Sequence, residues 1–211
     1  MNKQMIRESL VLFIITLAAG LLLGSVYAIT KHPIAQAQED KKQSAYQSVF
    51  SDAVTFTDLE GVNAEAAAGI LQEGGFEKNT IQEVKQAEDA AGTVLGYVMT
   101  IRSAEGYGGE FEIALGIRMD GTVNQIAFLS LSETIGLGME AKKPAFYEQF
   151  SGRRADAFAY SKSGAVAENE IDAISGATIT TNAVTNAVNA GICYARSLGL
   201  SDTQEGGGSD E

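Results

Sequence analysis

A hydroxyl-rich segment near the C-terminus carries the strongest chemical signal in the chain. It reads Asp172-Ala-Ile-Ser-Gly-Ala-Thr-Ile-Thr180 and runs directly into a helical pattern. The first amides of a helix have no partner within the helix and lie at the positive end of its dipole, so they attract anions. Small residues beside them let a phosphoryl group approach the backbone. The segment predicts a phosphate-binding helix start, with an ordinary Ser or Thr helix cap as the alternative.

The helix that must present these amides extends from Asn182 to Leu198. Small residues recur at every fourth position along it, and Val184, Val188 and Ile192 form the neighbouring row. A period of about 3.6 residues is typical of a helix with one buried face. We therefore expect this face to be buried and the amides of residues 178–181 to be available to a ligand.

The pattern Asp-x-x-Ser-Gly-Ala-Thr-x-Thr resembles the flavinylation motif of the FMN-binding domain found in the G subunit of Rnf complexes and the C subunit of sodium-pumping NADH:quinone reductases. In that family the last threonine of the motif is esterified to the phosphate of FMN. The resemblance implies a phosphoester-linked FMN on Thr180, attached by a separate flavin transferase. The residues that the transferase would recognise are Asp172, Ser175, Gly176, Ala177 and Thr178.

Two earlier loops extend the resemblance. The first, Gly106-Tyr-Gly-Gly109, and the second, Glu133-Thr-Ile-Gly-Leu-Gly138, occur in the family's order before the hydroxyl-rich motif, although each alone would suggest an ordinary turn. Ile135 stands where the family usually has Pro, so the φ restriction that Pro imposes is absent. Glycines let backbone amides face a flavin, and Glu133 and Thr134 offer polar contacts. The cofactor-binding residues implied here are Tyr107, Gly108, Glu133, Thr134, Gly136, Leu137 and Gly138.

An uncharged apolar run from Leu10 to Ile29 follows a short N-terminal segment, residues 1–9. It matches the roughly 20 residues that cross a bilayer, and it is long for the apolar part of a cleaved signal peptide, which is the alternative. Gly20 and Gly24 form a small-xxx-small pair typical of helix packing in membranes. The flanking Lys and Arg residues are too evenly divided to set the orientation.

The remaining patterns predict an α+β fold, with an antiparallel sheet flanked by helices. Residues 30–60 read as a partly helical connector, and residues 61–200 as a single FMN-binding domain. Strand patterns occupy residues 93–101, 111–118 and 123–131, and Asp120-Gly121 between the last two is a hairpin signal. Helices are expected at 64–71 and after Pro144, and a strand around Phe158. The acidic, glycine-rich tail 201–211 is expected to be disordered.

Composition excludes several other functions. A formal net charge of -12 argues against nucleic acid as a partner. The chain has one cysteine, Cys193, and one histidine, His32, at the boundary of the apolar run. These residues provide no iron–sulfur ligand set and no disulfide, and no dinucleotide fingerprint is found.

These patterns, with the resemblance, predict a membrane-anchored electron-transfer subunit of an ion-translocating ferredoxin:NAD oxidoreductase complex. The resemblance favours the Rnf complex, because the chain is too compact for the insertions of the quinone reductase protein. It implies integral-membrane and iron–sulfur subunits and membrane lipid as partners, and a single-pass protein of the inner membrane with an extracytoplasmic FMN domain. Two alternatives stay open: a stand-alone extracytoplasmic flavin carrier or reductase, and a non-redox anchored binding domain.

Overall fold

The computed structural model describes residues 3–59 and 61–200, and the chain divides into two compact units after Lys41. The first unit is part of one long helix, α1 (Lys3–Val49), which continues through Pro33. This helix contains a stretch that is long and apolar enough to cross a membrane, judged by length and composition, and none of that stretch is buried within the protein. The expected membrane span, residues 10–29, lies inside α1.

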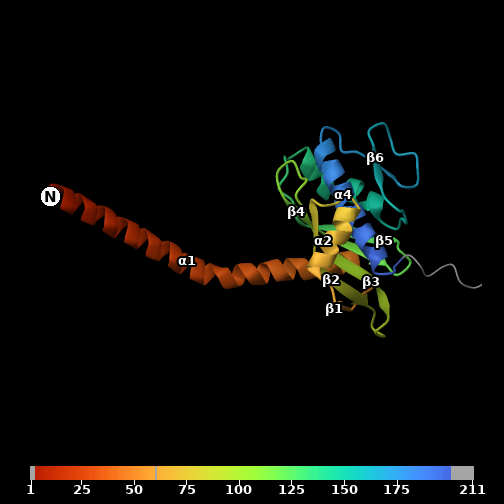
Figure 1. Cartoon of the computed structure of the whole chain (residues 1–211), viewed down its shortest axis with the longest axis horizontal. Coiled ribbons are helices and arrows are strands. Elements are labelled where there is room, and N and C mark those ends of the chain that lie inside the picture. The colour runs from red at the N-terminus through yellow and green to blue at the C-terminus, as the bar shows by residue number, and fades with distance from the viewer. Residues whose placement is uncertain (1–2, 60, 201–211) are drawn as a thin grey trace, which may run out of the picture. The chain divides into compact units, whose positions relative to one another are not determined.

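The second unit is built on a five-stranded antiparallel sheet in the order β1-β2-β3-β4-β5 (Figure 1). The strands are β1 (Thr55–Asp58), β2 (Asn79–Glu88), β3 (Val94–Ser103), β4 (Phe111–Arg118) and β5 (Val123–Ser130). The α+β architecture with an antiparallel sheet is confirmed. The Asp-Gly signal also marks a real hairpin: Gly121 has a φ of +82°, and Asp120 Oδ1 accepts a hydrogen bond from the Thr122 amide at 2.9 Å.

Helices and a second small sheet complete this unit. The helices are α2 (Ala64–Glu73), α3 (Pro144–Tyr147) and α4 (Thr178–Ser197), with two 3₁₀ turns, η1 (Gly138–Lys142) and η2 (Glu148–Phe150). The strands β6 (Ala159–Ser161) and β7 (Glu170–Asp172) pair in parallel. The strand expected around Phe158 is present as β6, whereas β7 and the parallel pairing were not predicted from the sequence. Asn189 of α4 ties this region to the core, because its side chain bonds both the amide and the carbonyl of Phe158, at 2.7 and 2.9 Å.

Strand β2 was not predicted from the sequence, because its apolar and polar residues do not alternate regularly. Ile81 and Val84 are three positions apart, and yet both belong to the same core cluster. The pairing with β3 is irregular between Ile81 and Glu83, so one extra residue is inserted there and the later residues change face. Apolar residues three positions apart fit a helix as well as a bulged strand. The bulge therefore removes the alternation with a period of two residues that would have predicted a strand.

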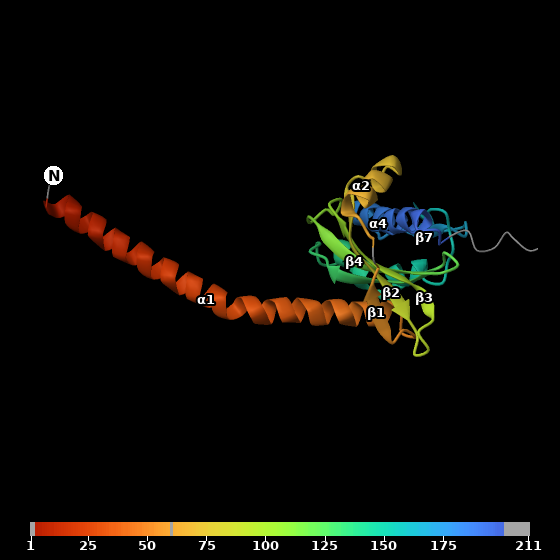
Figure 2. The same cartoon turned by 60° about the horizontal axis from the view of Figure 1, so that its bottom comes forward.

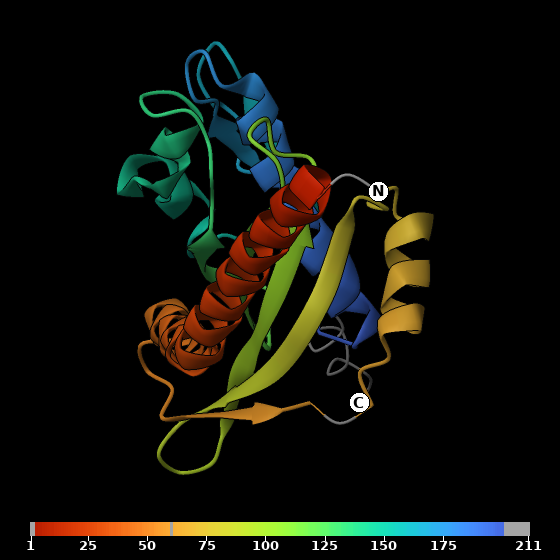
Figure 3. The same ribbon diagram turned by 90° about the vertical axis from the view of Figure 1, so that its left-hand side faces the viewer.

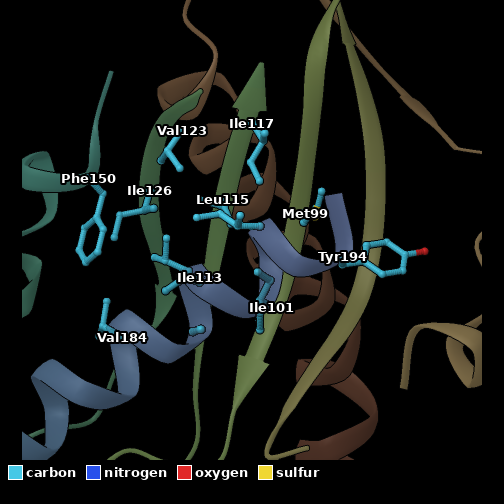
Figure 4. Close-up of a cluster of buried hydrophobic side chains, with 14 of the residues drawn as sticks. Met99, Ile101, Ile113, Leu115, Ile117, Val123, Ile126, Phe150, Val184 and Tyr194 are labelled. Carbon is cyan, nitrogen blue, oxygen red and sulfur yellow. The ribbon is translucent and has the colours of Figure 1, made fainter. Parts of the chain in front are cut away.

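One face of the sheet carries the main hydrophobic core, which α4 and α2 cover (Figure 2). Figure 4 shows side chains of β3, β4 and β5 meeting α4 in this layer. Gly191 of α4 makes the close approach possible: a Cβ atom there would stand 2.2 Å from Leu115 Cδ2 and 2.7 Å from Ile101 Cδ1. The buried face expected for this helix is confirmed.

The last turns of α1 cover the other face of the sheet. Tyr46, Val49 and Phe50 are buried there against small residues of β3 and β4, and a Cβ atom on Gly116 would stand 2.2 Å from Val49 Cγ1. We expected the folded domain to begin at residue 61, after a connector. In the structure the compact unit begins at Lys42 and includes β1, because the aromatic residues at the end of α1 are part of its core. The predicted disordered tail, residues 201–211, lies outside the described residues.

Candidate cofactor site

Three segments that are distant in the sequence gather at one end of the second unit (Figure 3). They are the β3–β4 loop, the segment between β5 and η1, and the first turn of α4. Between them lies a pocket of about 530 Å³. This volume is within the roughly 300–1,000 Å³ of small-molecule sites in proteins.

Nine of the twelve predicted site residues line this pocket, and one further residue, Ile179, joins them. The exceptions are Gly108, whose position against the carbonyl of Ser132 leaves no room for a side chain, and Gly136 and Ser175, which line a neighbouring hollow. Ile179 was missed because it is a variable position of the motif. The sequence signal that could have identified Ile179 is its apolar side chain between two threonines at the start of a helix. The predicted lining residues are Tyr107, Glu133, Thr134, Leu137, Gly138, Gly176, Ala177, Thr178 and Thr180.

The first turn of α4 is free of a conventional cap. Its N-cap residue is Ala177, and no side chain among the described residues makes a capping hydrogen bond there. Gly176 has a φ of +74°, a conformation that favours glycine, and it turns the chain into the helix. The alternative of an ordinary Ser or Thr cap therefore does not describe this helix. The Thr181 amide donates to the Ala177 carbonyl at 2.9 Å, so the expectation of free amides over residues 178–181 was wrong at Thr181, and the amides of residues 178–180 are the ones available to an anion.

Thr181 positions this turn, a role that the sequence analysis did not assign. Its buried hydroxyl accepts a hydrogen bond from the Ile174 amide at 3.0 Å and donates one to the Ala177 carbonyl at 2.9 Å. These bonds tie the segment before the helix to its first turn. Asp172 also has a structural role, because its Oδ1 accepts from the amide of Ala165 at 2.6 Å.

Thr180 is 1% exposed, and its hydroxyl borders a small space that exists only because residue 138 is glycine. A Cβ atom on Gly138 would stand 2.6 Å from Thr180 Oγ1. The same point is 2.8 Å from Glu133 Oε2. The Thr180 hydroxyl and the Glu133 carboxylate therefore border the same small space, one from α4 and the other from the segment after β5.

Glu133 is the only charged residue among the described residues that line the pocket. Its Oε1 atom is buried and has no hydrogen-bond partner within the described part of the chain. The β3–β4 loop approaches this oxygen closely, because a Cβ atom on Gly106 would stand 3.1 Å from it. A buried acceptor without a partner is costly, so this oxygen is suited to a ligand that donates a hydrogen bond.

The outer part of the pocket is apolar and open to solvent. Tyr107, Leu137 and Ile179 line it with exposed fractions of 69%, 42% and 54%. Ile135, which replaces the Pro usual in the family, lies two residues before Leu137 in the chain and is 89% exposed. The site thus combines a polar inner end, formed by the helix start and Glu133, with an apolar and accessible outer end.

Comparison with known proteins identifies the family. Residues 106–192 match the FMN-binding domain, and residues 1–49 match the RnfG N-terminal region. The G subunit of the Na⁺-translocating ferredoxin:NAD⁺ oxidoreductase complex of Acetobacterium woodii is 33% identical over 193 residues, which are 90% of this chain and 91% of the relative. The chain belongs to the RnfG family.

A second RnfG protein is similar to this chain over most of its length. The G subunit of the proton-translocating ferredoxin:NAD⁺ oxidoreductase complex of Clostridium ljungdahlii is 33% identical over 170 residues, 81% of this chain and 80% of the relative. The preference for the Rnf protein over its quinone reductase counterpart is confirmed. The crystal structure of Shewanella oneidensis NqrC aligns with 57% of this chain and 61% of its own, with 19% identity and a TM-score of 0.47.

The pocket of this RnfG-family chain fits FMN by three observations. The first-turn amides of α4 lack a capping side chain and suit a phosphate. The unpartnered Oε1 of Glu133 suits a hydroxyl or N–H donor of the flavin. The exposed side chains of Tyr107 and Leu137 offer apolar surface for an aromatic ring system.

Proposed function

We propose that this chain is the FMN-carrying electron-transfer subunit of an ion-translocating ferredoxin:NAD⁺ oxidoreductase complex. The names of its relatives supply the type of complex, and the FMN-binding domain match supplies the cofactor. The observation that carries the proposal is the pocket that joins the hydroxyl-rich motif to both glycine loops. Bound FMN supplies one- and two-electron redox chemistry, and the protein supplies attachment, orientation and access.

The cofactor is joined to Thr180 through a phosphate ester in this proposal. The Thr180 hydroxyl faces the pocket at the helix start, where unpaired amides can hold the phosphate oxygens. No Lys or Arg is found among the described residues lining the pocket, so the amides and the helix dipole must supply the positive potential. A covalent link compensates for this modest electrostatic attraction, because a tethered cofactor cannot dissociate.

The apolar outer end of the pocket is the place for the isoalloxazine ring. Leu137 and Ile179 would contact its faces or edges, and Glu133 and Thr134 would form hydrogen bonds with its polar atoms or with the ribityl chain. Because Tyr107 and Ile179 remain more than half exposed, redox partners could approach a ring held there. This arrangement suits a relay between other proteins of the complex.

The membrane part of the proposal rests on α1. Its apolar stretch would span the inner membrane once, in contact with lipid, and the second unit would lie on the extracytoplasmic side. A Cβ atom added at Gly20 or Gly24 meets nothing within 4 Å, so this small-residue face is available for integral-membrane subunits. Complete assembly of a Gly20→Leu, Gly24→Leu double variant would rule out that docking surface. Activity of a periplasmic phosphatase fused after residue 200 tests the orientation.

The decisive experiment measures covalent flavin. The full-length protein is purified from a host that contains the flavin transferase, and its intact mass and in-gel flavin fluorescence are recorded after denaturation. We expect an FMN-sized mass increment in the wild type and none in Thr180→Ala. Thr80→Ala, which removes an exposed threonine of β2 outside the pocket, serves as the matched control and should keep the increment.

Other results of this experiment would favour one of the two alternative functions or another attachment site. A colourless wild-type protein with the mass of its sequence would indicate a non-redox anchored domain. A flavinylated protein that purifies without any integral-membrane or iron–sulfur subunit would indicate a stand-alone carrier or reductase. Retention of the increment in Thr180→Ala would place the ester on another residue.

A further inference from the structure

The neighbourhood of Thr180 contains a base as well as a nucleophile. A hydroxyl attacks phosphorus effectively only when its proton is removed as the new bond forms. Glu133 Oε2 and Thr180 Oγ1 border the same small space, 2.8 and 2.6 Å from the point where a Cβ atom of Gly138 would stand. We propose that Glu133 is the catalytic base of the chain's own flavinylation and accepts the proton of the Thr180 hydroxyl.

This inference rests on the proposed function, because it concerns the step that attaches FMN to Thr180. The donor is a flavin–nucleotide pyrophosphate, presented by the flavin transferase. Thr180 Oγ1 forms a bond to the phosphorus on the flavin side, and the pyrophosphate P–O bond breaks. The nucleoside monophosphate leaves with the bonding electron pair, and the hydroxyl proton moves to Glu133 Oε2.

Burial supports an internal base. Thr180 is 1% exposed, so a side chain of the transferase has little access to its hydroxyl except through the pocket, which the flavin donor would fill. Glu133 already reaches the inner end of that pocket from within the same chain. No hydrogen bond joins the two side chains among the described residues; a catalytic hydrogen bond is often long or poorly aligned before substrate binds and forms fully in the reacting complex.

Charge also supports this assignment. A carboxylate beside a phosphate would be repulsive if both kept their charges. Once Glu133 has taken the proton it is neutral, so the repulsion is removed as the ester forms. Its other oxygen, Oε1, is buried without a partner among the described residues and can orient the flavin part of the donor.

The test measures the rate of mass gain of the full-length chain in detergent, with purified flavin transferase and FAD, under single-turnover conditions. We expect Glu133→Gln to slow the reaction by about 100-fold or more, as removal of a general base typically does. Glu140→Gln is the matched control. Glu140 lies on η1 outside the pocket, paired with Lys143 at 2.6 Å, and its loss should leave the rate unchanged.

Chemical rescue separates a base from a structural residue. Glu133→Ala leaves room for a small carboxylate, and we expect added formate, but not chloride at equal ionic strength, to restore at least a tenth of the wild-type rate. A Glu133→Gln rate within threefold of wild type would overturn the proposal. A slow variant with a lowered melting temperature, or no rescue by formate, would also overturn it by assigning Glu133 a structural role. Absence of any mass gain in the wild type would instead reject the covalent FMN itself.

Discussion

Replacing Gly138 with alanine tests the geometry of the site most directly. Gly138 does not adopt a positive φ, so the backbone conformation at this position accepts alanine. The new methyl group, however, would stand 2.6 Å from Thr180 Oγ1 and 2.8 Å from Glu133. Real Cβ atoms essentially never come closer than 3.0 Å to such neighbours, so the two side chains must move.

The size of the effect follows from these distances. Widening the contact from 2.6 Å to between 3.0 and 3.4 Å displaces the Thr180 hydroxyl or the methyl group by about 0.4 to 0.8 Å. Misplacement of a reacting group by about 1 Å can cost roughly 100-fold in rate, so we expect covalent FMN incorporation to slow by about 10- to 100-fold. Overpacking lowers the free energy of unfolding by about 1–3 kcal/mol. Replacing glycine with alanine also reduces the conformational entropy of the unfolded chain, which restores about 0.4–1 kcal/mol.

The assay combines intact-mass kinetics of FMN incorporation with thermal unfolding of the same samples. For a domain of this size, the expected loss lowers Tm by less than about 10 °C, at roughly 2–4 °C per kcal/mol. Gly69→Ala is the matched control, because it makes the same chemical change on α2, where a Cβ atom meets nothing within 4 Å. It should keep the incorporation rate and gain about 0.5–1 kcal/mol of stability.

One result would refute the reasoning. If Gly138→Ala incorporates FMN at the wild-type rate and melts at the wild-type temperature, the space between Thr180 and Glu133 is not as tight as the structure shows. A fall in Tm with an unchanged incorporation rate would keep the packing argument but remove its link to the modification of Thr180.

Two further predictions concern the scaffold that holds the site. Gly191→Ala would place a Cβ atom 2.2 Å from Leu115 Cδ2, so urea unfolding should show a loss of about 1–3 kcal/mol. Burial alone would raise the pKa of Glu83, but hydrogen bonds and charges from Lys42 and Lys85 hold it below its ordinary value of 4.5. A lowered pKa in the folded state adds stability that is present above pH 4.5 and is lost as the pH falls through the folded value. Glu83→Gln should therefore be less stable than the wild type at pH 7 and lose less stability on acidification, as measured by urea titrations at several pH values.

Local patterns in the sequence determined several elements of this protein. The Asp120-Gly121 hairpin and the strands on either side of it were predictable, because turn chemistry and β-branched runs act over a few residues. The helix after Thr180 was predictable from its 3.6-residue period. The apolar run in α1 and the three ordered motifs also pointed to an anchored member of the FMN-binding family, before any contact was known.

Only the tertiary structure decided how these parts meet. It shows that the N-cap residue of α4 is Ala177, not a serine or threonine, that β2 contains a bulge, and that Phe50 belongs to the core of the second unit. It also places Glu133 beside Thr180 across the space at Gly138. These two residues are 47 positions apart. Their approach depends on how α4 packs on the sheet, and a long-range packing contact leaves no period or spacing in the local sequence.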